Sequence, residues 1–326
     1  MPRPKILSTR PLFEAARRIL DATCDVDYWT SPERINRAEL LRRVQDKEGL
    51  VCLLTEKVND ELLAAAPKLC IAANIAVGFD NIDVPACTRR GVAATNTPGV
   101  LDETTADFAW TLLMAVARRI GEGEQLARSG NWKGWDLDQL CGTDVWGKTL
   151  GILGFGRIGR AVARRAAGFR MKVLYHDAMH ATEAAERELH AEYRDFNALL
   201  VESDFLSVHV PLLAETRGLL SGPQFARMKP TAFLINTSRG PVIDEAALVH
   251  ALETGKIAGA ALDVYENEPF ILPGLKRPNT VLAPHLASAS LETRTKMACM
   301  AAENVVAMLT GKRPPNLLNP EIWKER

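Results

Sequence analysis

The sequence has no excess of charge of either sign, because 40 Lys and Arg residues balance 40 Asp and Glu residues in 326. This balance gives no electrostatic footprint for nucleic acid or for an acidic membrane surface. Long apolar runs are also missing. The longest stretch without a charged residue, Pro278 to Leu291, has 14 residues and contains two prolines, so it is too short and too interrupted to span a bilayer. We therefore expect neither a nucleic-acid partner nor a membrane partner.

The six cysteines lack the spacing of a disulfide framework or of a metal site, since they are scattered and form no C-x-x-C pair. We expect them to be reduced and mostly buried, as in a cytoplasmic protein. The chain runs from Met1 into a strand-like segment at Ile6 without an apolar signal core, which agrees with that location.

The length is typical of two domains, each with its own hydrophobic core. In the first hundred residues, short apolar runs alternate with helical patterns, the strands being expected at 5–8, 49–54 and 69–73 and the helices at 12–21 and 59–66. This alternation predicts an α/β fold with a parallel sheet covered by helices on both faces. A long apolar helix is expected at 102–120.

The rhythm resumes after Thr149. Six strands are expected at 150–153, 172–176, 205–210, 232–236, 258–262 and 280–283, with helices between most of them at 158–167, 196–202, 224–228 and 245–254. Six strands joined by crossovers match a complete dinucleotide-binding domain. Because the series is complete before the last helix, 292–310, we expect that helix to pack on the first domain.

The segment 121–147 shows little periodicity but carries three of the six tryptophans, Trp132, Trp135 and Trp146. Large aromatic side chains in an irregular arm are typical of an interaction surface. The alternative, an arm folded back on its own domain, stays open.

The strongest local motif is Gly154-Phe-Gly156-Arg-Ile-Gly159, which follows an apolar strand and opens an amphipathic helix. In a dinucleotide site the first glycine permits the tight turn, the second admits the pyrophosphate and the third allows close packing of helix on sheet. The N–H groups of the helix terminus then bind the phosphates. A Gly-rich turn with a purely structural role is the alternative.

The next expected strand ends at Asp177, 18 residues beyond Gly159. A carboxylate there accepts hydrogen bonds from the ribose hydroxyls and repels a 2′-phosphate. No Lys or Arg follows in 178–182, so we expect NAD(H) to be preferred over NADP(H). His176 and His180 could be read as a metal pair, but they straddle a strand end and a loop, and we expect no metal site.

Three ionisable residues, Arg239, Glu268 and His285, follow buried strands, and open α/β sheets bind ligands at the carboxyl ends of their strands. His285 would donate a proton to a carbonyl oxygen as hydride arrives. Glu268 would orient the imidazole and stabilise its charged form, and Arg239 would bind a carboxylate and polarise the carbonyl. Taken singly, each also fits a satisfied core histidine or a surface ion pair.

Together these segments resemble the D-isomer-specific 2-hydroxyacid dehydrogenases, and among them the glyoxylate/hydroxypyruvate reductases. The matching segments occur in order along the whole chain: 76–83, 96–100, 151–159, 207–211, 236–240, 262–264, 268–269 and 284–285. The resemblance implies a flavodoxin-like substrate-binding domain of residues 1–99 and 288–326. It also implies a Rossmann NAD-binding domain of residues 100–287, with a dimerisation arm at about 121–147 and a homodimer joined through the cofactor domains.

The resemblance also implies roles for individual residues. Arg239, Glu268 and His285 would form the catalytic triad, and the substrate would contact Arg239 and His285, the backbone N–H groups of Val77 and Gly78, and Leu53 as a pocket wall. The cofactor would contact Thr104, Gly154, Phe155, Gly156, Arg157, Ile158, Gly159, Asp177, Val210, Pro211, Thr237, Asp263 and Ser288, with Asp263 facing the nicotinamide carboxamide.

The chain departs from the family pattern at Leu286-Ala287-Ser288, where Ile-Gly-Ser is usual, and at Asp177, where some members carry a nearby basic residue. The expected reaction is NADH-dependent reduction of small 2-oxo acids, glyoxylate to glycolate and hydroxypyruvate to D-glycerate. Phosphite or 3-phosphoglycerate dehydrogenases are alternatives, although phosphite enzymes carry a lysine where Val77 stands. A non-enzymatic NAD-sensing scaffold is a third.

Overall fold

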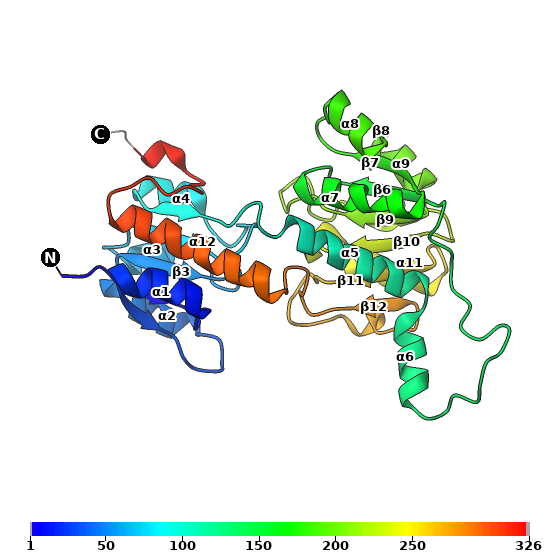
Figure 1. The fold of residues 1–326 in the computed structure, drawn as a ribbon, viewed down its shortest axis with the longest axis horizontal. Coiled ribbons are helices and arrows are strands. Elements are labelled where there is room, and N and C mark those ends of the chain that lie inside the picture. The colour runs from blue at the N-terminus through cyan, green and yellow to red at the C-terminus, as the bar shows by residue number, and fades with distance from the viewer. Residues whose placement is uncertain (1, 324–326) are drawn as a thin grey trace. The chain divides into compact units, whose positions relative to one another are not determined.

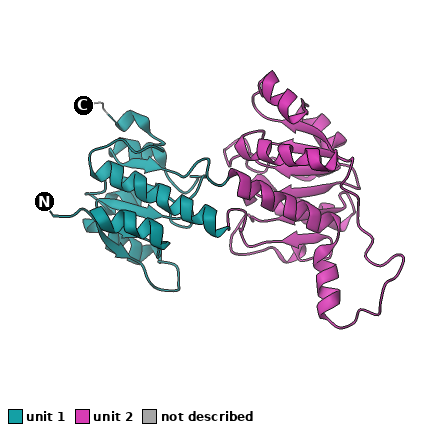
Figure 2. Ribbon diagram, in the orientation of Figure 1, with its two compact units in different colours: residues 1–101, 290–326 teal, residues 102–289 magenta. Residues whose placement is uncertain are grey.

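The computed structural model describes residues 2–323, and the chain divides into two compact units (Figure 2). Residues 1–101 and 290–326 make up the first unit, and residues 102–289 make up the second. Both are α/β units with a parallel sheet and helices on its two faces (Figure 1), so the expected fold class is confirmed.

The first unit has a five-stranded sheet in the order β2-β1-β3-β4-β5, with every neighbouring pair parallel. The strands are β1 (Lys5–Ser8), β2 (Asp25–Tyr28), β3 (Gly49–Cys52), β4 (Ile71–Asn74) and β5 (Ala93–Thr95). This order is that of a flavodoxin-like sheet.

Helices of the first unit cover both faces of this sheet. One face is covered by α1 (Glu14–Thr23) and the long α12 (Leu291–Leu309), which pack against each other and share a core with the strands. The other face is covered by α2 (Arg37–Arg43), α3 (Asp60–Ala65) and α4 (Val84–Arg89). Residues from both ends of the described chain therefore complete one core.

The second unit has a seven-stranded parallel sheet in the order β12-β11-β10-β9-β6-β7-β8. The strands are β6 (Thr149–Leu153), β7 (Lys172–His176), β8 (Ala191–Tyr193), β9 (Phe205–Val208), β10 (Phe233–Asn236), β11 (Gly259–Leu262) and β12 (Thr280–Leu282). The order reverses between β6 and β9, and such a switch point is where doubly wound sheets bind ligands, outside the carboxyl ends of the strands.

The helices of the second unit also form two layers. One layer contains α5 (Asp102–Ala117), α7 (Arg157–Ala166) and α8 (Glu183–Leu189), and the other contains α9 (Phe196–Glu202), α10 (Gly222–Phe225) and α11 (Glu245–Glu253). A further helix, α6 (Ile120–Arg128), leads into the tryptophan-bearing arm.

Several boundaries differ from the sequence-based expectation. The strands β2, β5 and β8 were not expected. All three lie at sheet edges, where β5 has only three residues and polar residues interrupt the apolar pattern of β2 and β8. The expected helix 102–120 ends at Ala117, and α6 occupies the start of the arm. No residue of α6 is buried, so the sequence carries no apolar stripe to reveal it.

The cysteines are less buried than expected. All six are free thiols, but only Cys24, Cys52 and Cys87 are buried, and Cys141 is exposed. No helix within residues 2–323 combines the length and the apolar character needed to cross a bilayer.

Candidate active site

The three residues of the expected triad follow three neighbouring strands of the second unit. Arg239 comes after β10, Glu268 lies in the loop after β11, and His285 comes after β12. The imidazole Nδ1–H of His285 donates to Glu268 Oε2 over 2.9 Å, and both side chains are partly exposed, at 28% and 34%. The structure thus pairs an imidazole with a carboxylate at an accessible position.

The electrostatics of Glu268 favour its ionised form. Burial acts to raise the pKa of its carboxyl. The hydrogen bond and the charge of His285, the hydrogen bond from the Tyr265 N–H and the charge of Arg239 all act to lower this pKa, and the net effect is a lowered pKa. The guanidinium of Arg239 therefore acts on the same carboxylate. An ionised Glu268 stabilises a protonated imidazole, as a proton donor requires.

Asp263 holds the turn that presents His285. Its carboxylate is fully buried and accepts hydrogen bonds from the backbone N–H groups of Leu286 (2.6 Å) and Ala287 (2.8 Å). Burial raises the pKa of the Asp263 carboxyl, and the two N–H groups oppose that effect. His285 adopts a left-handed backbone conformation, with φ of 57°, which costs about 1–3 kcal/mol and persists only where the surroundings impose it.

Asn236, at the end of β10, shapes the turn that carries Arg239. Its amide nitrogen donates to the Arg239 carbonyl over 3.0 Å, and its amide oxygen accepts from the Ser238 N–H and hydroxyl. The Arg239 side chain bonds back to the Ser238 carbonyl over 2.9 Å. A fully buried asparagine thus fixes the backbone from which the guanidinium extends.

The glycine motif connects β6 to α7. Gly154 has φ of +95°, and a Cβ there would lie 2.6 Å from Val210 N. A Cβ at Gly159 would lie 2.1 Å from the Gly154 carbonyl oxygen, whereas one at Gly156 would meet nothing within 4 Å. Gly156 is also the N-cap of α7 and provides no side-chain cap. Open space at the amino terminus of α7, a helix of ten residues, fits a phosphate group.

Two further observations fit a dinucleotide at this edge. Asp177, at the end of β7, accepts a hydrogen bond from the Phe155 N–H over 2.6 Å, which fixes the carboxylate beside the glycine turn. The Thr237 hydroxyl is buried and has no hydrogen-bond partner among the described residues, as expected of a group that binds a ligand. The remaining expected cofactor contacts lie in the same unit, at Thr104, Arg157, Ile158, Val210, Pro211 and Ser288.

The rings of His176 and His180 contact other groups. The His176 ring bonds to the Arg194 carbonyl over 3.0 Å, and the His180 ring stacks on Tyr193 at 3.7 Å between centroids. Within residues 2–323, no cluster of three His, Cys, Asp or Glu side chains could hold a metal ion.

In the first unit, Val77 and Gly78 follow β4, and Leu53 follows β3. The carbonyl oxygens of Ala76, Val77 and Gly78 accept hydrogen bonds from Thr97 N, Asn96 Nδ2 and Asn74 Nδ2 respectively. In a trans peptide the N–H points opposite to the preceding carbonyl. The N–H groups of Val77 and Gly78 therefore point away from Thr97 and Asn96.

The sequence reasoning missed the residues that support this loop. Asn81 Nδ2 lies within hydrogen-bonding distance of the carbonyl oxygens of Leu53 (3.1 Å) and Glu56 (3.0 Å), and its amide oxygen accepts from Asn74. The buried Glu56 accepts from the Leu53 N–H and from the Thr9 hydroxyl. Asn81 lies within the resembling segment 76–83, which was the only available signal, because it acts on backbone that is distant in sequence. Glu56 lies in none of the resembling segments, and its contact with Thr9 joins residues 47 positions apart.

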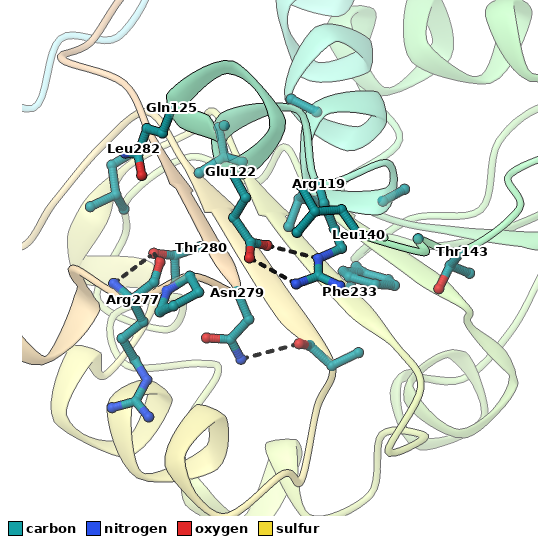
Figure 3. Close-up of a pocket in the computed structure, with 18 of the residues that line it drawn as sticks. Arg119, Glu122, Gln125, Leu140, Thr143, Phe233, Arg277, Asn279, Thr280 and Leu282 are labelled. Carbon is teal, nitrogen blue, oxygen red and sulfur yellow. Dashed lines mark hydrogen bonds and ion pairs between the residues drawn. The ribbon is translucent and has the colours of Figure 1, made fainter. Parts of the chain in front are cut away.

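A large pocket of the second unit lies elsewhere. It has a volume of about 1120 Å³ and is lined by the α6 region, the end of the arm, the amino ends of β10 and β11, including Phe233, and the edge strand β12, including Thr280 (Figure 3). Arg119 and Glu122, three residues apart in its lining, form a bidentate ion pair. Because the triad follows the carboxyl ends of the same strands, this pocket is at the opposite edge of the sheet.

Comparison with known proteins agrees with this geometry. Residues 110–287 match the family model described as "D-isomer specific 2-hydroxyacid dehydrogenase, NAD binding domain". The chain belongs to the D-isomer-specific 2-hydroxyacid dehydrogenase family. It is therefore a dehydrogenase that uses a nicotinamide cofactor, and the resemblance found in the sequence is confirmed.

The chain is similar to several named or solved proteins. A glyoxylate reductase of Korarchaeum cryptofilum is 50% identical, over 99% of this chain and 98% of its own. A solved protein from Thermus thermophilus is 40% identical with a TM-score of 0.90, over 96% of this chain and 99% of its own. The NADPH-dependent glyoxylate/hydroxypyruvate reductase of Sinorhizobium meliloti, solved with NADP and malonate, is 34% identical with a TM-score of 0.87, over 99% of both chains.

Proposed function

We propose that this dehydrogenase reduces small 2-oxo acids with NADH, glyoxylate to glycolate and hydroxypyruvate to D-glycerate. The observation that carries the proposal is the 2.9 Å contact between His285 and Glu268, on a carboxylate that also feels the charge of Arg239. In this proposal the unit of residues 102–289 binds the cofactor, and the unit of residues 1–101 and 290–326 contributes substrate contacts. The names of the relatives support the substrate class.

The catalytic step is a proton transfer coupled to hydride transfer. A bound nicotinamide supplies the hydride. His285 donates the proton to the carbonyl oxygen through Nε2, since Nδ1 is engaged by Glu268. Glu268 orients the imidazole and stabilises its charged form, and Arg239 polarises the carbonyl and binds the substrate carboxylate.

In this proposal, residues of the first unit select small oxo acids without a second charged group. The N–H groups of Val77 and Gly78 hold the carboxylate, and Leu53 forms an apolar wall. No basic residue stands beside Val77 and Gly78 in residues 71–85, so a second anionic group on the substrate would have no cation there. This supports uncharged short substituents on the oxo acid over phosphorylated ones.

The preference for NADH rests on Asp177. Its carboxylate is fixed by the Phe155 N–H, and no Lys or Arg occurs in 178–182 to bind a 2′-phosphate. Since the Sinorhizobium meliloti relative is NADPH-dependent, family membership alone does not decide the cofactor, and the preference is specific to these residues.

We also propose a homodimer joined through the cofactor-binding units. The arm exposes Trp135 at 82%, Leu137 at 79% and Trp132 at 57%. Clustered exposed aromatic residues are typical of protein interfaces, where they are enriched relative to other surfaces. The arm is therefore not covered by its own chain, and the partner proposed here is a second copy.

The activity can be tested with a substrate panel in the reducing direction. Glyoxylate, hydroxypyruvate, pyruvate and a phosphorylated oxo acid are compared by NADH oxidation, with His285→Ala as the catalytic control. We expect the highest kcat/KM on glyoxylate or hydroxypyruvate and a loss of at least ~10²-fold in His285→Ala, the usual contribution of a general acid. Best turnover on a long hydrophobic oxo acid would overturn the substrate class, and near-normal turnover of His285→Ala would remove it as proton donor.

A further inference from the structure

Glu245 is a buried carboxylate near the triad to which the proposed mechanism gives no role. It is the first residue of α11 and is only 5% exposed. Its Oε1 accepts a hydrogen bond from the backbone N–H of Glu266 over 2.8 Å. A buried acid on a helix thus binds the backbone of the loop that carries Glu268.

The segments joined by this bond are packed backbone to backbone. A Cβ added at Gly240 would lie 1.9 Å from the Tyr265 carbonyl carbon and 2.4 Å from Glu266 N. The chain between Arg239 and Glu245 therefore lies directly against residues 265–266. Any shift of one segment would displace the other, because close-packed interiors transmit strain.

The loop in turn fixes the carboxylate that faces His285. The Tyr265 N–H donates to Glu268 Oε1 over 3.2 Å, and Glu268 Oε2 accepts from His285. The Tyr265 hydroxyl lies within hydrogen-bonding distance of the carbonyl oxygens of Leu262 (3.2 Å) and Ala283 (3.0 Å), at the ends of β11 and β12. Glu245 adds a hydrogen bond from α11 to the same loop, at the Glu266 N–H.

We propose that Glu245 is a positioning residue, which holds the 265–268 loop so that the Glu268 carboxylate stays aligned with His285. The inference rests on the proposed function, since it assigns Glu245 to the same proton-donating pair. Glu245 does not contact the reacting atoms in this proposal, and its effect passes through Glu268.

The hydrogen bond, and not the charge, is what the proposal requires of Glu245. Burial raises the pKa of the Glu245 carboxyl, its bond from the Glu266 N–H opposes that, and the carboxylates of Glu266 and Glu268 add to the rise. Asp263, Arg239 and His285 are further charged or titratable groups at this edge, and Asp244 is the N-cap of α11. A carboxyl or amide oxygen accepts the same N–H whether or not the group is charged.

Three substitutions separate these contributions in the full-length enzyme. Glu245→Gln keeps an acceptor at the same reach, Glu245→Asp keeps the charge at the helix terminus but shortens the side chain by one methylene, and Glu245→Ala removes both. We expect Glu245→Gln to stay within about 3-fold of the parent in kcat. Glu245→Asp and Glu245→Ala should lose about 10- to 100-fold in kcat with little change in KM, the range expected from misplacing a catalytic group by up to 1 Å.

The pH profile of kcat/KM gives a readout that a purely structural role would not change. Glu268→Gln removes the carboxylate that stabilises protonated His285. As pH rises, kcat/KM of this variant should therefore begin to decline at a lower pH than kcat/KM of the parent. Glu245→Asp and Glu245→Ala should shift the alkaline limb in the same direction. Leu248→Ala, which truncates a fully buried side chain one turn along α11, should lower Tm without moving the limb.

The outcomes distinguish the inference from the proposed function. If Glu268→Gln leaves both rate and pH profile unchanged, the proposed function fails. If Glu268→Gln responds but Glu245→Asp and Glu245→Ala keep the parent kcat and limb, or if Glu245→Asp is more active than Glu245→Gln, the positioning role of Glu245 is overturned. The comparison of Asp with Gln decides the question even if Glu245→Ala does not fold.

Discussion

At the scale of the residue, the proposed preference for NADH depends on Asp177. Its carboxylate lies at the end of β7 and accepts a hydrogen bond from the Phe155 N–H over 2.6 Å. There it would accept hydrogen bonds from the ribose hydroxyls of NADH and repel the 2′-phosphate of NADPH. We predict that Asp177→Ser combined with Ala178→Arg shifts the ratio of kcat/KM for NADH over NADPH toward NADPH by at least ~10-fold, because repulsion is replaced by a phosphate partner.

The measurement is the pair of kcat/KM values with one oxo acid held constant. Ala178→Arg alone is the matched control and should shift the ratio less, since the Asp177 carboxylate remains. An unchanged ratio in the double variant would show that cofactor choice is determined elsewhere in the unit.

His209, just after β9, should make stability depend on pH. Burial lowers the pKa of its imidazole to about 3 from an ordinary 6.5, and its Nε2 lies 2.8 Å from the Ser207 hydroxyl. Between pH 6.5 and 3 the unfolded chain therefore binds a proton that the folded chain does not. The free energy of unfolding should fall as pH decreases through this range, by up to about 1.4 kcal/mol per pH unit from this residue.

The prediction is checked by urea unfolding of the parent and of His209→Gln at pH 7 and pH 5. The variant has no titrating group at this position, so its loss of stability between the two pH values should be smaller by about 1–2 kcal/mol. Equal losses in the two proteins would exclude His209 as the source of the acid sensitivity.

At the scale of elements, two glycines of the turn between β6 and α7 should have different roles, Gly156 in cofactor binding and Gly159 in stability. A Cβ at Gly156 meets open space, whereas a Cβ at Gly159 would lie 2.1 Å from the Gly154 carbonyl oxygen. We predict that Gly156→Val weakens NADH binding by at least ~10-fold with little change in Tm, because only the approach of the pyrophosphate is blocked. Gly159→Val should instead lower Tm, because its side chain collides with backbone.

Fluorescence titration with NADH and thermal unfolding measure the two effects separately. Equal losses of Tm in Gly156→Val and Gly159→Val would contradict the assignment of Gly156 to cofactor binding.

The central elements were predictable from the sequence, and the edges were not. Central strands such as β6 and β10, which are almost entirely buried, have mostly apolar sequences bounded by turn residues, which is the pattern of a parallel sheet. By contrast, β2 alternates Asp with Val and Tyr, and none of its residues is buried. A half-exposed edge strand of four residues does not differ enough from a loop to be recognised.

The same contrast applies to the candidate site. The glycine motif and the positions of Arg239, Glu268 and His285 follow from short local patterns, and the structure places the last two in contact. Glu245 and Asn81 act on backbone 21 and 25–28 residues away, and no local pattern encodes such partners. Their contribution becomes visible only when the folded chain brings the segments together.

For the molecule as a whole, the arm predicts association. A tryptophan that is 82% exposed, as Trp135 is, costs free energy in water unless a partner covers it. We predict that the parent enzyme sediments with the mass of two chains, and that replacing Trp132 and Trp135 together by Ser raises the dissociation constant by about 30-fold or more, the effect of losing interface hot spots.

Sedimentation velocity over a dilution series measures this change, and Val201→Ser provides the control, since Val201 is also exposed, at 51%, but lies on α9 away from the arm. The control should keep the mass of the parent at every concentration. In our proposal, all catalytic residues of one active site come from one chain. The arm variant should therefore keep its kcat at saturating cofactor under conditions in which its dimer has dissociated. A parent enzyme that sediments as a single chain at all concentrations would assign the exposed tryptophans a role other than dimerisation.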